Sequence, residues 1–282
     1  MCGTAFRHRL NPARALGRIC GWLPDTRAMI LLLDIGNTNT HLGLANVRRV
    51  TRQADLPTTL WFAGGAKVRI KKFAGSAEIE AAVLCSVVPQ ATPLSRKVVH
   101  QLWHLTPFEL TARTLRGFGI DYPQPDTIGP DRLANAVAAR HHFGAPVVVV
   151  DFGTAVTFDV VDRAGNYAGG IIAPGLAAMT EYLHEKTALL PRITIRETRS
   201  VIGKSTEQAM LIGAVQGYRG LIRELLHELR RQLKTRRLPV VATGGYAPLI
   251  SAKLSEITAV QPDLTLEGLR LAWLGNHIKR TV

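Results

Sequence analysis

The sequence predicts an α/β protein built from two domains of similar topology, and three observations support this prediction. Apolar runs at 29–33 and 147–150 predict buried strands, and each run ends in a turn of the form Asp-x-Gly, about half a chain apart. Strand-like and helix-like segments alternate along the chain, as they do in α/β proteins. Of the 282 residues, 46% are hydrophobic and 20% are charged, which is typical of a folded protein with a substantial core.

The first half of the chain opens with two strands joined by a polar turn. The strands expected in this half are 29–33, 41–45 and 81–88, with the turn at 34–40. A helix is expected over 133–142, because proline in the preceding Gly129-Pro130-Asp131 suits the first turn of a helix.

The second half repeats the strand–turn–strand pattern. Its expected strands are 147–150, 156–161 and 239–242, with turns at 151–155 and 243–245. The longest helical pattern covers 205–233, where Ser205 and Gln208 have the spacing of a capping box. Apolar residues fall on more than one face of this helix, so we expect a second copy of the chain to cover one of them.

Composition excludes several classes of protein. No run of about 18 apolar residues is present, so we expect no membrane-spanning helix. The three cysteines, Cys2, Cys20 and Cys85, lack the spacing of a zinc module and are too few for a disulfide framework. Such sparse cysteine usage is typical of a reducing compartment, and we expect a cytoplasmic protein.

The formal net charge of +14 makes a polyanion a candidate partner. The basic residues are scattered, however, with runs at 67–72 and 230–237 that contain no interleaved aromatic stacking platform. We therefore interpret them as a solvated basic surface and expect no nucleic-acid partner.

Residues 1–28 differ from the rest of the chain. They hold five arginines, a single acid and two of the three cysteines, and they lack the apolar centre of a secretory signal. Because a strong strand pattern begins at Met29, we interpret 1–28 as an N-terminal extension outside the fold. The expected domains are then 29–143 and 144–282.

The two Asp-x-Gly turns have the side chains of a phosphate site. Glycine allows backbone N–H groups to approach a ligand, and Asn37, Thr38 and Thr154 add polar donors. Asp34 and Asp151 offer hard oxygen ligands for a cation or for a metal-bound water. One such turn alone is equally typical of an ordinary hairpin. Two of them at the carboxyl ends of similar strands favour a ligand site.

Seven short motifs occur in an order that resembles a known family. They are Asp34-Ile35-Gly36-Asn37-Thr38, Gly129-Pro130-Asp131-Arg132, Asp151-Phe152-Gly153-Thr154-Ala155 with Thr157 and Asp159, Gly169-Gly170-Ile171-Ile172-Ala173-Pro174-Gly175, Thr187-Ala188-Leu189-Leu190-Pro191, Gly203-Lys204-Ser205-Thr206 and Thr243-Gly244-Gly245. From about Met29 to Asn276 the chain resembles type III pantothenate kinase, the bacterial family that includes Bvg accessory factor-like proteins.

The resemblance implies a fold, a reaction and partners. The fold would be actin/hexokinase-like, with ATP between two ribonuclease-H-like domains. The reaction would be the ATP- and Mg²⁺-dependent phosphorylation of pantothenate at its primary hydroxyl, the first step toward coenzyme A. A monovalent cation, K⁺ or NH₄⁺, would be required. The protein would be a homodimer with its substrate pocket at the subunit interface.

The resemblance also implies roles for individual residues. Those that would bind ATP are Asp34, Ile35, Gly36, Asn37, Thr38, Asn39, Thr40, His41 and Thr154. Those that would bind pantothenate are Tyr122, Gly129, Pro130, Asp131, Arg132 and Thr206. Asp131 would be the general base, and Asp151 would bind the monovalent cation. One departure is Pro130, which stands where the family usually has alanine and which removes an N–H donor.

Some alternatives stay open at this point. Asp131 has the position of an acid that simply favours a helix start. The paired histidines 141–142 are more typical of a structural role. A nucleic-acid-associated regulator is an alternative because the chain is basic and because Bvg accessory factor is named for a regulatory role. Another kinase or a phosphatase of the same fold would reuse the two phosphate turns, since fold alone does not fix function.

Overall fold

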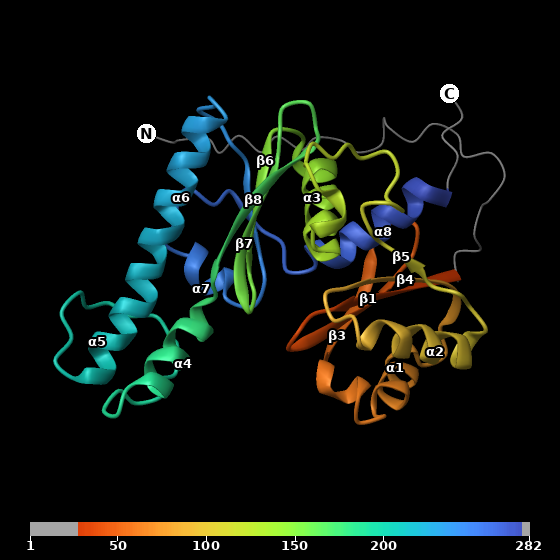
Figure 1. Cartoon of the computed structure of the whole chain (residues 1–282), viewed down its shortest axis with the longest axis horizontal. Coiled ribbons are helices and arrows are strands. Elements are labelled where there is room, and N and C mark those ends of the chain that lie inside the picture. The colour runs from red at the N-terminus through yellow and green to blue at the C-terminus, as the bar shows by residue number, and fades with distance from the viewer. Residues whose placement is uncertain (1–27, 278–282) are drawn as a thin grey trace, which may run out of the picture.

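The computed structural model describes residues 28–277, arranged as two five-stranded sheets with helices between and around them (Figure 1). The predicted N-terminal extension therefore lies outside the described residues, apart from Ala28. Within the described part, no helix is both long enough and apolar enough to span a bilayer.

The first sheet contains all three strands expected in the first half of the chain. Its strands are β1 (Ala28–Ile35), β2 (Asn39–Ala45), β3 (Val50–Pro57), β4 (Glu78–Ser86) and β5 (Phe108–Glu109). Their order is β3-β2-β1-β4-β5; β1, β2 and β3 pair antiparallel, while β4 is parallel to β1 and to β5. The helices of this half are η2 (Thr58–Trp61), α1 (Ala66–Ala74), α2 (Ala91–Trp103), η3 (Pro125–Thr127) and α3 (Pro130–Phe143).

The second sheet repeats this arrangement. Its strands are β6 (Val147–Phe152), β7 (Ala155–Val161), β8 (Tyr167–Pro174), β9 (Val240–Thr243) and β10 (Ala259–Val260). The order β8-β7-β6-β9-β10 matches that of the first sheet, with β6, β7 and β8 antiparallel and β9 parallel to both β6 and β10. This duplicated topology confirms the expected actin/hexokinase-like fold of two ribonuclease-H-like halves.

The remaining helices belong to the second half of the chain. They are α4 (Leu176–Lys186), α5 (Thr206–Ile212), the π-helical turn η4 (Gly213–Gly217), α6 (Tyr218–Gln232), α7 (Ala247–Ser251) and α8 (Leu264–His277). Figure 1 shows α3 and α8 between the two sheets, and α4, α5 and α6 on the far side of the second sheet.

Both central strands are buried on both faces, which explains their continuous apolar sequences. In β1, Ile30 and Leu32 pack into the central core with α3 and α8, whereas Leu31 and Leu33 pack with α1 and α2. In β6, alternate valines divide in the same way: 147 and 149 face the central core, and 148 and 150 face α6 and α7. The central core is therefore shared by both sheets.

The expected helix over 205–233 is interrupted by the π-helical turn. Ser205 caps its start, because the N–H of Gln208 donates to Ser205 Oγ at 3.2 Å. The Gln208 side chain accepts from the N–H of Lys204 rather than from that of Ser205. Glycines 213 and 217 bound the π turn, and glycine is the weakest helix former after proline.

The inference of two apolar stripes on this helix needs correction. Leucines 221, 225 and 229 are only partly buried, but they pack against the same cluster as Ile222 and Leu226. The chain itself therefore contacts both sets, and the second set is no evidence for a second copy of the chain.

Candidate active site

The first turn carries exposed polar groups, whereas the carboxyl at its start, that of Asp34, is buried. Asp34 lies near the end of β1 with only 8% of its surface exposed, and the Cys85 thiol of neighbouring β4 donates to its Oδ1 at 3.3 Å. Residues 37–39 of the following turn are exposed. The turn therefore presents side-chain and backbone donors to solvent directly beside a buried carboxylate.

The end of this predicted phosphate loop has a different environment. The Thr40 hydroxyl is fully buried, where it hydrogen-bonds Thr58 Oγ1 at 3.1 Å and accepts from Trp61 Nε1 at 2.9 Å. His41 turns outward and pairs with Asp55 at 2.6 Å. The side chain of Thr40 thus fastens β2 to η2, while that of His41 stays near the surface.

The second turn is built at the end of β6. Asp151 is opposite Thr243 in the register between β6 and β9, so the 243–245 turn lies beside it. Gly244 has φ +87°, and an added Cβ would lie 2.6 Å from Asp151 Oδ1. Both facts favour glycine at 244 and account for the third Gly-rich turn seen in the sequence.

The two turns meet across the molecule. Thr38 Oγ1 and Thr154 Oγ1 lie 3.2 Å apart, although 116 residues separate them in the chain. Each threonine is exposed at the tip of its turn. Hydroxyls from the two sheets therefore converge on one solvent-accessible point, as expected of two facing domains.

Helix α3 carries Asp131 toward this point. Pro130 occupies the first turn of the helix, and the N–H of Arg132 donates to Asp131 Oδ1 at 2.8 Å. Asn135 lies one turn further along the same face and donates to Asp151 Oδ2 at 3.1 Å. The base candidate and the cation-ligand candidate are thus linked through one face of α3.

Four carboxylates share this region, and each has a raised pKa. Burial, against the opposing charge of His41 and together with the charges of Asp131 and Asp151, raises the pKa of Asp34 to about 7. Burial likewise raises the pKa of Asp151 to about 6, that of Asp159 to about 7, and that of Asp131 above its ordinary value. The site therefore favours binding of positive charge, as protons or as cations.

His41 responds to the same negative field. Its burial lowers its pKa, but the nearby carboxylates of Asp34 and Asp55 outweigh that effect and leave the pKa raised. The imidazole therefore tends toward its charged form beside the first turn.

The donor set fits cations that are shared with phosphates. Within residues 28–277, no three His, Cys, Asp or Glu side chains converge as a complete metal site. Mg²⁺ usually takes only one or two protein carboxylates and completes its shell with water and substrate phosphate. Asp34 and Asp151, beside the exposed turns, are suitable oxygen donors for Mg²⁺ and for a monovalent cation.

The predicted pantothenate residues fall into two places. Arg132 lies on α3, where its Nε donates to Asp159 Oδ1 at 2.7 Å, and Tyr122 lies near Tyr167 with ring centroids 6.2 Å apart. Thr206 is exposed at the start of α5, and Figure 1 shows α5 well away from α3, beyond the second sheet. A single chain therefore brings together the predicted residues except Thr206.

Sequence reasoning assigned no role to three residues of this arrangement, although Asp159 stands in one of the seven motifs. Asn135 has i+4 spacing from Asp131, a signal that was available. Asp159 is an acid inside an apolar strand pattern, which also marks it as unusual. Tyr167 had no signal, because its contact with Asp159 depends on the register between β7 and β8.

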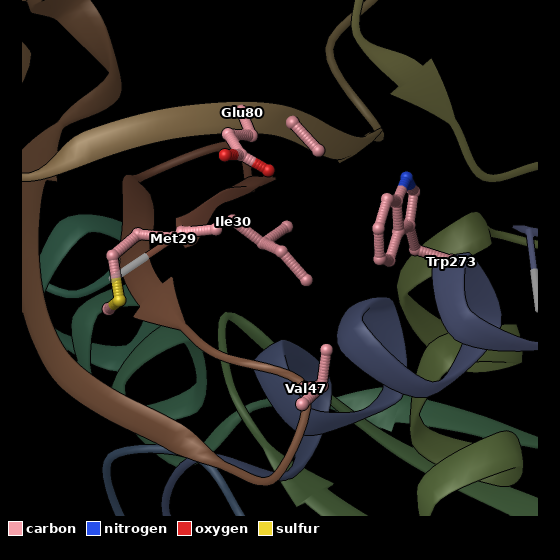
Figure 2. A pocket seen from close by; sticks show the side chains of 7 residues that line it. Met29, Ile30, Val47, Glu80 and Trp273 are labelled. Carbon is pink, nitrogen blue, oxygen red and sulfur yellow. The ribbon is translucent and has the colours of Figure 1, made fainter. Parts of the chain in front are cut away.

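Two hollows elsewhere do not include the predicted site residues. Figure 2 shows the smaller one, about 10 Å³, lined by residues that include Ile30, Glu80 and Trp273 at the amino end of β1. It is large enough for one water at most. The larger, about 490 Å³, lies over β3 and α1 beside Arg52 and Phe73. The candidate site instead lies at the carboxyl ends of β1 and β6, away from the smaller hollow at the amino end of β1.

Comparisons with known proteins agree with this geometry. Residues 30–228 match the family model of type III pantothenate kinase. A type III pantothenate kinase of Akkermansia muciniphila is 46% identical over 242 residues, covering 86% of this chain and 97% of that protein. One of Methylacidiphilum infernorum is 42% identical, covering 86% of this chain and 87% of that protein.

Solved structures show the same fold at lower similarity. A crystal structure from Campylobacter jejuni, described as a Baf family transcriptional activator, has a TM-score of 0.55 and 19% identity. It covers 85% of this chain and 95% of its own. The ethanolamine utilization protein EutJ of Carboxydothermus hydrogenoformans has a TM-score of 0.50 and 15% identity, covering 89% of this chain and 91% of its own.

Proposed function

The chain belongs to the type III pantothenate kinase family and phosphorylates pantothenate with ATP in coenzyme A biosynthesis, and we propose that its two facing turns and α3 carry out this transfer. The observation that supports the proposal most directly is the 3.2 Å approach of the Thr38 and Thr154 hydroxyls. Phosphoryl transfer needs positioning and charge neutralisation more than covalent chemistry, and this point offers donors from both halves.

ATP phosphates are held by the two turns. The exposed donors of residues 37–39 and the Thr154 hydroxyl bind phosphate oxygens from opposite sides. Ile35 and Gly36 shape the first turn, and the buried Thr40 hydroxyl anchors its end. His41, with its raised pKa, adds positive charge beside the triphosphate.

Cations balance the negative charge of the site. Asp34 would hold Mg²⁺, and Asp151 would hold K⁺ or NH₄⁺. When bound, these ions neutralise charge on the transferring phosphoryl group. The raised pKa values of both carboxyls support this role, because a cation would replace the proton that burial otherwise favours.

Asp131 accepts the proton of the attacking hydroxyl. Its raised pKa, caused mainly by burial, brings the carboxylate closer to the pH at which a general base works best. The alternative, an acid that only stabilises the helix start, accounts for its bond to the N–H of Arg132 but not for its position among three other carboxylates. We therefore assign the catalytic role to Asp131.

Arg132, Tyr122 and the 129–130 backbone bind pantothenate, and Thr206 is supplied by a second copy of the chain. The separation of α5 from α3 supports a site that is completed in a homodimer, which we place in the cytoplasm. Six of the ten large apolar side chains that the described residues expose lie between 172 and 202. They are Ile172, Tyr182, Leu183, Leu189, Val201 and Ile202. They lie on β8, on α4 and in the segment that leads to α5, and exposed apolar side chains at such a density are typical of a protein interface.

A component-omission assay tests the proposal. Purified protein with ATP, Mg²⁺, K⁺ and pantothenate is expected to form phosphopantothenate, and leaving out any one component is expected to abolish or strongly reduce product. Sodium should substitute poorly for potassium. Asp151→Asn should lose the potassium response but keep its magnesium dependence, because the change removes one charge from one cation site. Equal wild-type rates in sodium and potassium buffers would contradict the assignment of Asp151.

A further inference from the structure

Asp159 is a buried carboxylate in an unusual place. It lies in the middle of β7, opposite Val149 of β6 and Gly170 of β8, and none of its surface is exposed. A charged group at such a position is costly unless hydrogen bonds or opposite charge compensate for it. A retained buried acid therefore requires a structural or functional reason.

The predicted substrate arginine compensates one of the two oxygens of Asp159, Oδ1, whereas Oδ2 is buried and has no hydrogen-bond partner among the described residues. Arg132 Nε donates to Asp159 Oδ1 at 2.7 Å, and Arg132 Nη2 donates to the carbonyl oxygen of Phe158 at 3.1 Å. The hydroxyl of Tyr167 donates to the same Asp159 oxygen at 3.1 Å. The Arg132 guanidinium also lies over the Tyr167 ring, with Cζ 5.9 Å from its centroid.

These contacts use one edge of the guanidinium and leave its end available. Nε and Nη2 bind protein oxygens, whereas Nη1 has no partner among the described residues and is not buried. Arginine can bind a carboxylate through its two terminal nitrogens as well as through its side. The held guanidinium can therefore still bind an anion in a fixed orientation.

The strand beside Asp159 is shaped around this arrangement. A Cβ on Gly170 would collide with the Phe158 carbonyl oxygen and with Arg132 Nη2, so any larger residue would displace the guanidinium. Tyr167 in turn meets the ring of Tyr122 edge-on, which connects the network to another predicted pantothenate residue. Asp159, Tyr167 and Gly170 together fix one orientation of Arg132.

We propose that Asp159 is a positioning residue for pantothenate binding, which acts by holding the Arg132 guanidinium with its free end toward the substrate carboxylate. This inference rests on the proposed contact between Arg132 and pantothenate, and it gives Asp159 no contact with substrate. Because Arg132 is adjacent to Asp131 on α3, the same ion pair helps to fix the first turn that carries the base.

The test is steady-state kinetics of Asp159→Asn, which replaces the carboxyl that accepts from Arg132 with an amide of the same shape. The KM for pantothenate is expected to rise about 10- to 100-fold, the usual effect of losing a charged hydrogen bond. The KM for ATP should change less than about twofold. Tyr167→Phe, which removes only the second donor, should raise the KM for pantothenate less; it carries the test if Asp159→Asn does not fold.

A matched control separates positioning from general loss of stability. Glu267→Gln weakens another buried arginine pair, in which Arg270 Nε donates to Glu267 Oε2 at 2.7 Å. That pair lies at the other end of α3, near His142. The Glu267→Gln variant is expected to have a lower melting temperature and an unchanged KM for pantothenate. A similar rise in KM in this control would overturn the proposal.

A double-variant cycle with Arg132→Met tests the positioning role of Asp159 separately from the proposed substrate contact of Arg132. If Asp159 acts through Arg132, adding Asp159→Asn to Arg132→Met should change the KM for pantothenate less than about twofold. An undiminished effect in that background, or no effect of Asp159→Asn alone, overturns the positioning role and leaves the proposed function intact. An unchanged KM in Arg132→Met itself refutes the proposed substrate contact of Arg132.

Discussion

At the scale of single residues, the carboxylates differ mainly in what surrounds them. Asp34 accepts from a buried thiol, Asp151 from an amide, and Asp159 from an arginine and a tyrosine. Within residues 28–277, Asp131 accepts from backbone N–H groups, such as that of its neighbour Arg132, and from no other side chain. It is therefore the one of the four whose carboxylate is least engaged by other side chains, as a proton acceptor for substrate needs to be.

Asp131→Asn is expected to reduce kcat by about 10²–10⁴-fold while ATP binding stays nearly unchanged. The amide keeps the shape of the side chain but cannot take the hydroxyl proton. Turnover and nucleotide titration of the same preparation measure both quantities. Asp126→Asn is the control, because Asp126 forms only an exposed pair with Arg113, which contributes little. Near-normal turnover in Asp131→Asn would remove Asp131 from the mechanism.

At the scale of elements, α3 and α8 decide how the site is held. Backbone atoms of the two helices approach so closely at Gly268 that a Cβ there would collide with the carbonyl of Ala134. This contact lies one turn from Asp131 along α3, on an alanine-rich stretch that is almost fully buried. Helix α8 therefore braces the amino-terminal part of the helix that carries the base.

Two glycine-to-alanine changes in α8 should have opposite effects on stability. Gly268→Ala is expected to destabilise the protein by about 1–3 kcal/mol, because backbone must move to admit the methyl group. Gly275→Ala meets its nearest atom at an ordinary 3.6 Å and should stabilise by up to about 1 kcal/mol through helix propensity. Chemical denaturation of both variants measures the difference. A neutral Gly268→Ala would show that the two helices can separate without cost.

The sequence revealed the elements that depend on local pattern. The strands at 29–33 and 147–150 and the Ser205 cap are confirmed, because burial on both faces and capping leave direct traces in the order of residues. It did not reveal that α8 returns to the first sheet, or that Asn135 reaches Asp151. Those contacts depend on how distant segments pack, which periodicity alone does not encode. The assignment of site residues and the boundary at 143–144 remain predictions.

At the scale of the whole molecule, the carboxylate cluster should make stability depend on pH. The pKa values of Asp34, Asp151 and Asp159 are raised to about 7, 6 and 7 from an ordinary 3.8, so the folded protein binds more protons than the unfolded chain above pH 4. Stability should therefore fall as pH rises through this range. For a carboxyl that titrates alone, the loss is about 1.4 kcal/mol for every tenfold difference in proton affinity between the folded and unfolded states.

Melting temperatures without nucleotide or Mg²⁺ should accordingly be several degrees lower at pH 8 than at pH 5. The carboxyls of Glu197 and Glu267 have pKa values lowered to about 2, so they affect the stability of the protein only below pH 5. Asp159→Asn and Asp34→Asn should each flatten the slope. A melting temperature that is constant or rises from pH 5 to pH 8 would contradict the inferred proton binding.

The exposed apolar side chains between 172 and 202 should hold two copies together. Light scattering at micromolar concentration is expected to give the mass of a dimer for the wild type. Ile202→Glu should favour the monomer and lower activity, because Ile202 is 67% exposed in the segment that leads to Thr206. Val68→Glu changes an equally exposed side chain on α1 and should do neither. A monomeric wild type with full activity would exclude a shared site.

The core shared by the two sheets limits how the molecule can admit a nucleotide. Sliding the halves apart would expose the apolar faces of β1 and β6 that pack on α3 and α8. Parting the Thr38 and Thr154 hydroxyls costs only one solvent-exposed hydrogen bond, about 0.5–1.5 kcal/mol. Opening should therefore be a hinge motion in which the two turns move apart and α3 lies near the hinge axis. Asp131 would then move little, while the two turns that bind phosphate move relative to it.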